Sequence, residues 1–302
     1  MDLAVISFNQ ILTLAILMVI GIVCAKIKMI SEATNKQLSS LLLMLVNPLM
    51  IFLSYQRAFE RELLGGLLLA MLLSFISFLI TLLAAHVIYR HKEKDHALEK
   101  FSLVYTNAGF LGIPLVNGVF GSEGVFYLTG YLTVFFLFFW THGLIIMSGK
   151  KDVTAIKKAF ISPPMLAIFI GFICFTLSIE LPQTIYTPLR LLANINTPLA
   201  MLVAGISISN TNVVKLLKNK KIYAVCGLRL ILLPALTILI LAPFQIPAII
   251  LGTIIILSAC PVAANIILFA YRYDRDHLYA SELFAATTIL SLATIPLLLL
   301  LL

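Results

Sequence analysis

The chain has 302 residues, of which 61% are hydrophobic and only 11% are charged. An ordinary soluble domain carries about 25% charged residues, so this composition excludes a soluble protein and predicts a polytopic membrane protein. The net charge of +8 does not predict nucleic acid as a partner, because the basic residues lie in loops between apolar segments, where membrane topology accounts for them.

Ten apolar segments are long enough to cross a bilayer, which needs roughly 20 residues per helix. The first lacks a positively charged leader and a small-residue cleavage site, so we expect it to be retained as a span. The predicted spans are Ile6–Ala25, Leu38–Tyr55, Leu63–Tyr89, Leu98–Phe120, Val125–Met147, Pro164–Ile179, Ile185–Ser209, Ile222–Leu241, Pro247–Tyr271 and Leu278–Leu302.

Basic residues are distributed unequally between the loops. Loops after odd-numbered spans hold seventeen lysines and arginines, whereas the other side holds three, namely Arg57, Arg61 and Arg190. Cytoplasmic loops carry the excess of positive charge, so we expect both termini on the non-cytoplasmic side of the cell inner (plasma) membrane. Each half, 1–149 and 150–302, contains five predicted spans, and an odd number requires the halves to have opposite orientations.

Short motifs recur in the same order in both halves, which favours an internal repeat although each match is weak alone. We therefore predict an all-α polytopic membrane protein with ten transmembrane helices in two inverted five-helix repeats. The matching pairs are Ile20-Gly-Ile-Val-Cys24 with Ile170-Gly-Phe-Ile-Cys174, Val46-Asn-Pro-Leu49 with Ile195-Asn-Thr-Pro-Leu199, and Ser122-Glu123 with Ser281-Glu282.

Spans four and nine contain helix-breaking residues in their interiors. Proline lacks an N–H group and its ring clashes with the preceding turn, so we expect regular helix to stop around Gly112–Pro114 and again at Pro261. Non-helical backbone persists in a bilayer only inside protein or beside a wet cavity. Two such breaks in corresponding places are typical of the binding site of a secondary transporter, with a kink that improves packing as the alternative.

The two broken spans enter from opposite faces, so we expect them to cross near the bilayer midplane. Their second halves, beginning near Ile113 and Val262, are predicted to present unpaired N–H groups and a partial positive charge. A carboxylate or another small anion suits such a site. The carbonyl groups that end the first halves offset one another or hold a cation.

Five asparagines lie far from the span ends, where an unbonded amide is costly. Asn107 and Asn265 flank the two breaks, which favours them for the site, while a structural hydrogen bond between helices is the alternative for each amide. The predicted substrate-binding residues are Asn47, Asn107, Gly112, Pro114, Asn117, Asn196, Pro261 and Asn265.

Ionisable side chains are scarce in the spans. No Asp or Glu lies in 101–120 or 252–271, which argues against a cation exchanger. Glu282 and Glu123 are candidates for proton coupling, with a favourable position near a helix start as the alternative. Arg229 lies near enough to the cytoplasmic end of span eight that we expect it to extend to the interface; supplying positive charge to an anion path or pairing with a carboxylate is the alternative. We predict no metal, no cofactor and no enzyme activity, because neither metal-ligand spacing nor a catalytic motif is present.

The segment Asn107-Ala-Gly-Phe-Leu-Gly-Ile-Pro-Leu115 resembles Asn-Thr-Leu-Val-Met-Gly-Ile-Pro-Leu of plant members of the auxin efflux carrier family. Ala259-Cys-Pro261 and Asn47-Pro-Leu49 are similar to that family's Ala-Leu-Pro and Val-Pro-Leu. The resemblance covers the whole chain and implies a fold related to the sodium/bile-acid symporter and NhaA type. It also implies a scaffold of spans one, two, six and seven and a moving transport unit of spans three to five and eight to ten. The short loop after span five, Asn47 and Asn265 depart from the plant pattern and favour a bacterial organic-acid permease.

We therefore predict a secondary transporter that moves small organic anions such as malate by alternating access, with proton coupling left open. A sodium-coupled or cation-exchanging carrier of the same fold is the second hypothesis. A membrane-embedded enzyme or sensor is the third, against which the missing catalytic motif and soluble domain count. The expected partners are the anion, protons and the lipid bilayer, and a homodimer is left open.

Overall fold

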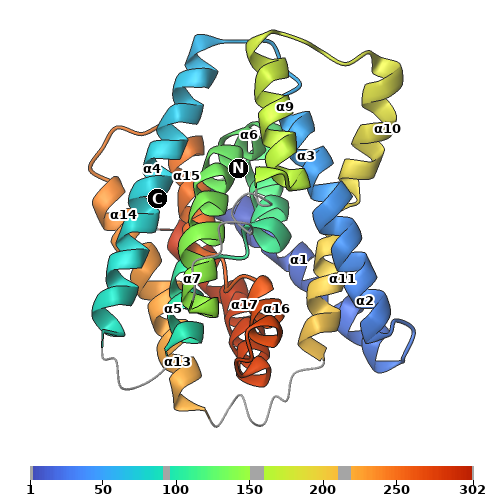
Figure 1. Ribbon diagram of the computed structural model, residues 1–302. Coiled ribbons are helices and arrows are strands. Elements are labelled where there is room, and N and C mark those ends of the chain that lie inside the picture. The colour runs from blue at the N-terminus through green and yellow to red at the C-terminus, as the bar shows by residue number, and fades with distance from the viewer. Residues whose placement is uncertain (1–2, 91–95, 150–159, 210–218, 301–302) are drawn as a thin grey trace.

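The computed structural model describes residues 3–90, 96–149, 160–209 and 219–300, which form helices joined by short connections (Figure 1). Within these ranges, seven helices are long and apolar enough to cross a membrane, and the shorter apolar helices Pro163–Thr176 and Ala248–Ala259 accompany them. Many large apolar side chains remain exposed on the outside of the bundle, as contact with lipid requires. The prediction of an all-α polytopic membrane protein is confirmed.

The helices of the first half follow predicted spans one to five, with ends that differ by a few residues. Gly121 interrupts α6 with φ 63° and ψ −156°, a conformation open to glycine because it has no Cβ, and this lies between predicted spans four and five. The bounds are α1 Leu3–Lys26, α2 Glu32–Leu41, η1 Leu42–Val46, α3 Asn47–Ser54, α4 Arg61–Ile88, α5 Ala97–Val104, η2 Ala108–Gly112, α6 Ile113–Phe138, η3 Phe139–Gly143 and α7 Leu144–Ser148, where η marks a π-helical turn.

The helices of the second half follow predicted spans six to ten. Polar side chains fix two of their starts, since Asn219 and Asp276 accept hydrogen bonds from backbone N–H groups of the first turns of α13 and α17. The bounds are α9 Pro163–Thr176, α10 Gln183–Asn194, α11 Asn196–Ser209, α13 Lys220–Gly227, η4 Leu228–Leu232, α14 Leu233–Leu241, α15 Ala248–Ala259, α16 Asn265–Arg272 and α17 His277–Leu299.

Three prolines inside spans are accommodated by π-helical turns that directly precede them. Pro48, Pro114 and Pro234 each lie in the first turn of a helix that directly follows η1, η2 or η4. A proline ring clashes with the carbonyl four residues earlier in an α-helix, and the wider π turn gives that carbonyl room. The prediction that helix stops around Gly112–Pro114 is therefore wrong, because η2 carries the helix up to Pro114 and through it.

Two groups of helices pack closely. α1 lies along α11, and α3 packs against α9 and α10. Elsewhere α4, α6, α14 and α15 contact one another. Between α1 and α11 the backbones approach so closely that a Cβ atom on Gly205 would stand 2.0 Å from the carbonyl oxygen of Met18. Small residues allow such contacts between membrane helices, where packing replaces the hydrophobic effect as the force of association.

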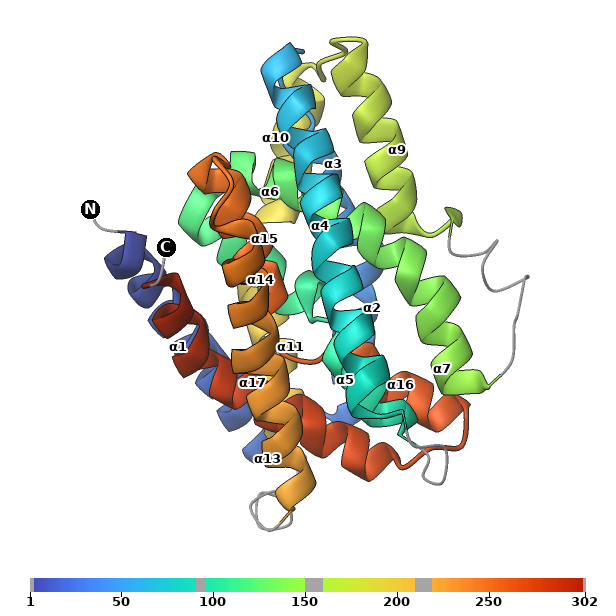
Figure 2. The ribbon, with the colours of Figure 1, turned by 90° about the vertical axis from the view of Figure 1, so that its left-hand side faces the viewer.

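The halves of the two broken spans lie on opposite sides of the molecule. In Figure 2, α5 and α16 lie toward one end, with α15 and the labelled part of α6 toward the other. Both chain ends, at the start of α1 and the end of α17, lie close together on one side. The two broken spans therefore run in opposite directions through the centre of the bundle.

Candidate functional site

Two stretches of extended backbone cross where spans four and nine are interrupted. The N–H of Asn107 donates to the carbonyl oxygen of Pro261 at 2.8 Å, and the N–H of Ala263 donates to that of Tyr105 at 2.9 Å. The segments pair as one antiparallel bridge. Each break thus satisfies backbone groups of the other, as irregular backbone at membrane depth requires.

The second half of span four starts closer to the crossing than predicted. Its helix begins at Ala108 and not near Ile113, because Asn107 caps it: Asn107 Oδ1 accepts a hydrogen bond from the N–H of Phe110 at 3.4 Å. The described hydrogen bonds give no acceptor to the N–H groups of Ala108 and Gly109. These groups are the donors that a helix start offers to a ligand.

The second half of span nine begins at Asn265 and not near Val262. Pro261 forces the preceding residue, Cys260, into an extended conformation with φ −59° and ψ 148°, so α15 ends here. The N–H of Val262 is not available, because it donates to Thr287 Oγ1 of α17 at 3.2 Å. The helix starts at the crossing are therefore unequal, and only that of span four has a side-chain cap among the described bonds.

A cavity of about 80 Å³ lies against the crossing and gathers several predicted site residues. Asn47, Asn107 and Asn265 line it with Thr106, and none of its lining residues is charged. Asn107 is 5% exposed, and its Nδ2 group has no hydrogen-bond partner. A buried amide N–H without an acceptor costs free energy, so Asn107 is the lining asparagine with an unsatisfied donor.

Asn196 lies behind the cavity and bonds to one of its walls. Its Nδ2 donates to Asn47 Oδ1 at 2.6 Å, and Asn47 Nδ2 donates to the carbonyl oxygen of Gly109 at 3.3 Å. Asn196 is 1% exposed, and its Oδ1 has no partner. These two amides connect spans two and seven to the start of span four, which gives Asn196 an interhelical hydrogen bond.

The other predicted residues of span four surround the crossing without lining this cavity. Gly112 allows a close approach to α15, since a Cβ there would stand 2.7 Å from Leu257 Cδ2. The carbonyl oxygen of Pro114 accepts a hydrogen bond from Gln10 Nε2 of α1 at 3.5 Å. Asn117 is half-buried and is not among the residues that line the cavity.

Arg229 does not extend to the membrane interface, so that prediction is wrong. Its side chain is fully buried in η4 at the crossing. Nη1 donates to the carbonyl oxygen of Leu103 at 3.3 Å, and Nη2 donates to that of Cys260 at 2.9 Å. Leu103 lies in the last turn of α5, and Cys260 is the residue directly after α15, so one guanidinium joins the places where both first half-helices end.

The two candidate proton carriers lie away from the cavity. Glu282 is half-buried in the second turn of α17, and Glu123 is exposed beside the Gly121 interruption. Glu123 borders a depression of about 600 Å³ that also contains Arg57 and Glu60. There burial lowers the pKa of the Arg57 guanidinium, and the charge of Glu123 opposes this shift.

Several polar side chains near the crossing were missed by the sequence analysis. Thr106 Oγ1 and the Tyr131 hydroxyl lie 3.1 Å apart, and the Tyr105 hydroxyl lies 2.9 Å from His142 Nδ1. The buried Glu99 accepts a hydrogen bond from a tyrosine hydroxyl of α17 at 3.4 Å. A tyrosine in an apolar segment cannot be distinguished by sequence from an ordinary hydrophobic residue, so these hydrogen bonds could be identified only from the structure.

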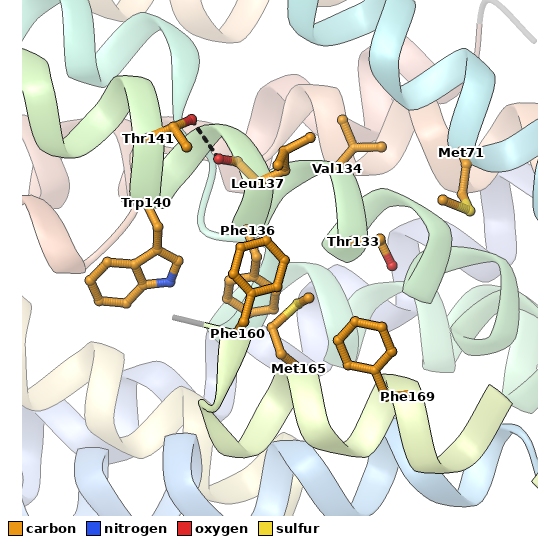
Figure 3. Close-up of a pocket in the computed structure, with 10 residues that line it drawn as sticks. All are labelled: Met71, Thr133, Val134, Phe136, Leu137, Trp140, Thr141, Phe160, Met165 and Phe169. Atoms are coloured by element: carbon orange, nitrogen blue, oxygen red, sulfur yellow. Dashed lines mark hydrogen bonds between the residues drawn. The ribbon is translucent and has the colours of Figure 1, made fainter. Parts of the chain in front are cut away.

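A second cavity, of about 170 Å³, lies between α4, α6 and α9 and is almost entirely apolar (Figure 3). Trp140, Phe136 and Phe169 contribute to its wall. The hydroxyl of Thr141 bonds within its own helix, to the carbonyl oxygen of Leu137 at 2.6 Å, and is not available to a ligand. Because its lining is almost entirely apolar and holds none of the asparagines at the crossing, this cavity does not suit a small anion.

An all-helical membrane bundle with two paired helix breaks beside a cavity lined by three asparagines is the architecture of a membrane transport protein. Residues 6–299 match the family model described as membrane transport protein, and the chain belongs to this auxin efflux carrier family. It is 26% identical over 299 residues to an uncharacterized transporter of Methanothermobacter thermautotrophicus, covering 96% of this chain and 97% of that one. An uncharacterized transporter of Methanocaldococcus jannaschii is also 26% identical over 298 residues, covering 94% and 95%.

Proposed function

We propose that the protein is a secondary transporter that moves small organic anions, such as malate or other carboxylates, across the membrane by alternating access. The observation that carries this proposal is Asn107, which lines the cavity at the crossing and whose buried Nδ2 has no hydrogen-bond partner. The N–H groups at the start of η2 lie beside it, at the positive end of a helix. A carboxylate accepts hydrogen bonds from both kinds of donor and neutralises the partial charge.

The lining of the cavity favours an anion over a cation. A cation carrier of this architecture needs a carboxylate near the midplane to replace the water around the ion. Asn47, Asn107 and Asn265 supply amides instead, and no acidic side chain lines the cavity. At about 80 Å³ the cavity has room for a carboxylate group, since a water molecule takes roughly 30 Å³ of liquid volume.

The proposal includes ten crossings in two inverted five-helix repeats. Gly121 divides the helical stretch Ala108–Ser148. The part after Gly121 is roughly 40 Å long at 1.5 Å per residue and suits one crossing, and the part before it, roughly 20 Å, completes another together with α5. The packing of α1, α3, α9, α10 and α11 supports a scaffold, and that of α4, α6, α14 and α15 supports a separate transport unit. Cysteine introduced at Ser122 is expected to react with an impermeant thiol reagent from the non-cytoplasmic side.

Uptake by liposomes tests the proposal directly. The purified protein is reconstituted and screened with labelled mono- and dicarboxylates, with and without an imposed proton gradient. We expect uptake of at least one carboxylate, a loss of roughly tenfold or more in its affinity in Asn107→Ala, and normal affinity in Asn117→Ala. Asn117 is the matched control, because it is an asparagine of the same span outside the cavity. Uptake of no carboxylate by folded protein, or equal affinity in the two variants, contradicts the proposal.

A further inference from the structure

The first half-helices bring two negative helix ends to the crossing. α5 and α15 both end there, and the last carbonyl groups of a helix have no partner within it and carry a partial negative charge. In transporters with broken helices, such ends and the adjacent unwound carbonyls are the ligands of a coupling cation. A positive group beside these two ends is therefore favourable.

The guanidinium of Arg229 supplies this positive charge and is covalently part of the protein. Its two Nη atoms bond one carbonyl from each half-helix end, at 3.3 Å to Leu103 and 2.9 Å to Cys260. A guanidinium remains protonated in proteins. No carboxylate lies within ion-pair distance of it in the described part of the chain, and its Nε has no partner. The carbonyl dipoles are thus its principal counter-charge.

We infer that Arg229 is a built-in cation that takes the place of a metal ion at the crossing and makes the carrier independent of Na⁺. The guanidinium already binds the carbonyl oxygens of Leu103 and Cys260 and repels a second cation. Unlike a bound ion, it stays in the protein throughout the transport cycle. The inference rests on the proposed function for the statement that the crossing is the substrate site, but its first test needs no substrate.

Thermal unfolding of the full chain in detergent is that test. The parent is compared in NaCl, LiCl, KCl and choline chloride at constant ionic strength, and we expect the same Tm in all four. Arg229→Ala is expected to lower Tm by about 5 °C or more, and millimolar methylguanidinium chloride is expected to restore part of this loss. Arg190→Ala removes an exposed arginine of α10 and is expected to show neither effect.

Three results overturn the inference. They are a Tm of the parent that rises saturably with Na⁺ or Li⁺, an Arg229→Ala variant as stable as the parent, and a loss of stability on which methylguanidinium acts no better than choline. If Arg229→Ala does not fold, Arg229→Lys keeps the charge without the two-pronged geometry. Its Tm is expected to be lower than that of the parent and to remain independent of Na⁺. Failure of the proposed function looks different, since it leaves a Na⁺-independent Tm and no carboxylate uptake.

Discussion

Asn107→Asp separates a substrate-binding role of Asn107 from a structural one. The side chain caps η2 through Oδ1, at 3.4 Å from the N–H of Phe110, and presents its unpaired Nδ2 beside the cavity. Aspartate has the same shape and keeps the cap, and its charge is favourable at a helix start. We therefore expect the variant to fold, with a lower Tm that reports the cost of burying the carboxylate. The donor, however, becomes an oxygen that cannot donate.

The expected loss of affinity follows from the lost donor and the added charge. A hydrogen bond to a charged partner contributes about 1.5–3 kcal/mol, which is roughly tenfold to a hundredfold in Kd. Two negative charges about 4 Å apart repel by a further ~4 kcal/mol at an effective dielectric constant of about 20. Together these put the loss at roughly a thousandfold or more, which removes measurable binding of a micromolar ligand.

Calorimetry with the carboxylate found in the liposome screen measures this loss, and thermal unfolding confirms that the variant is folded. Asn117→Asp makes the same chemical change in the same span outside the cavity, and we expect it to bind normally. If folded Asn107→Asp binds the anion as the parent does, Asn107 is a helix cap only and the reasoning from its unpaired donor is refuted.

Three further predictions use other positions. Pro261→Ala lets α15 continue through the break and is expected to reduce liposome uptake by roughly tenfold or more, the effect of losing a hydrogen bond to a charged partner. Pro114→Ala is expected to keep most of the uptake, because the helix of that span already runs through the proline. Equal effects of the two substitutions contradict this distinction. Gly205→Ala brings a Cβ atom against a backbone carbonyl group and is expected to lower Tm, whereas Gly65→Ala places its Cβ in open space and is expected to leave Tm unchanged. A Gly205→Ala variant with the Tm of the parent refutes the close contact. Glu282→Gln is expected to uncouple uptake from a proton gradient and to leave anion exchange intact, whereas normal proton-driven uptake excludes Glu282 as the proton carrier.

The existence of two broken spans could be predicted from the sequence, but only one break could be located. Cys260 before Pro261 is extended, whereas Ile113 before Pro114 remains helical with φ −59° and ψ −53°. The difference lies in the turn before each proline. Whether that turn widens to a π turn depends on its neighbours in space, such as the contact of Gly112 with α15. Local sequence shows that a proline perturbs a span but not how the perturbation is absorbed.

That several buried asparagines lie near one another could be predicted from the sequence, but their hydrogen-bond partners could not. The cost of burying an amide in an apolar span was enough to single out Asn47, Asn107 and Asn265, which line one cavity in the structure. The bond between Asn47 and Asn196 joins residues 149 positions apart, so no local pattern contains it. Assigning an amide to substrate or to structure therefore requires the list of donors and acceptors that remain unpaired after folding.

Arg229 shows which physical argument the sequence analysis lacked. Extension to the interface assumes that a side chain near the end of a span faces lipid, yet η4 turns this one inward. The crossing brings together two helix C-terminal ends and no carboxylate, and in a medium of low dielectric such ends require a positive group. Arg229 lies deeper in a predicted span than any other lysine or arginine of the chain. A search of the sequence for a basic side chain that could neutralise the negative helix ends therefore identifies Arg229. Its hydrogen bonds to the carbonyl groups of Leu103 and Cys260 agree with that role.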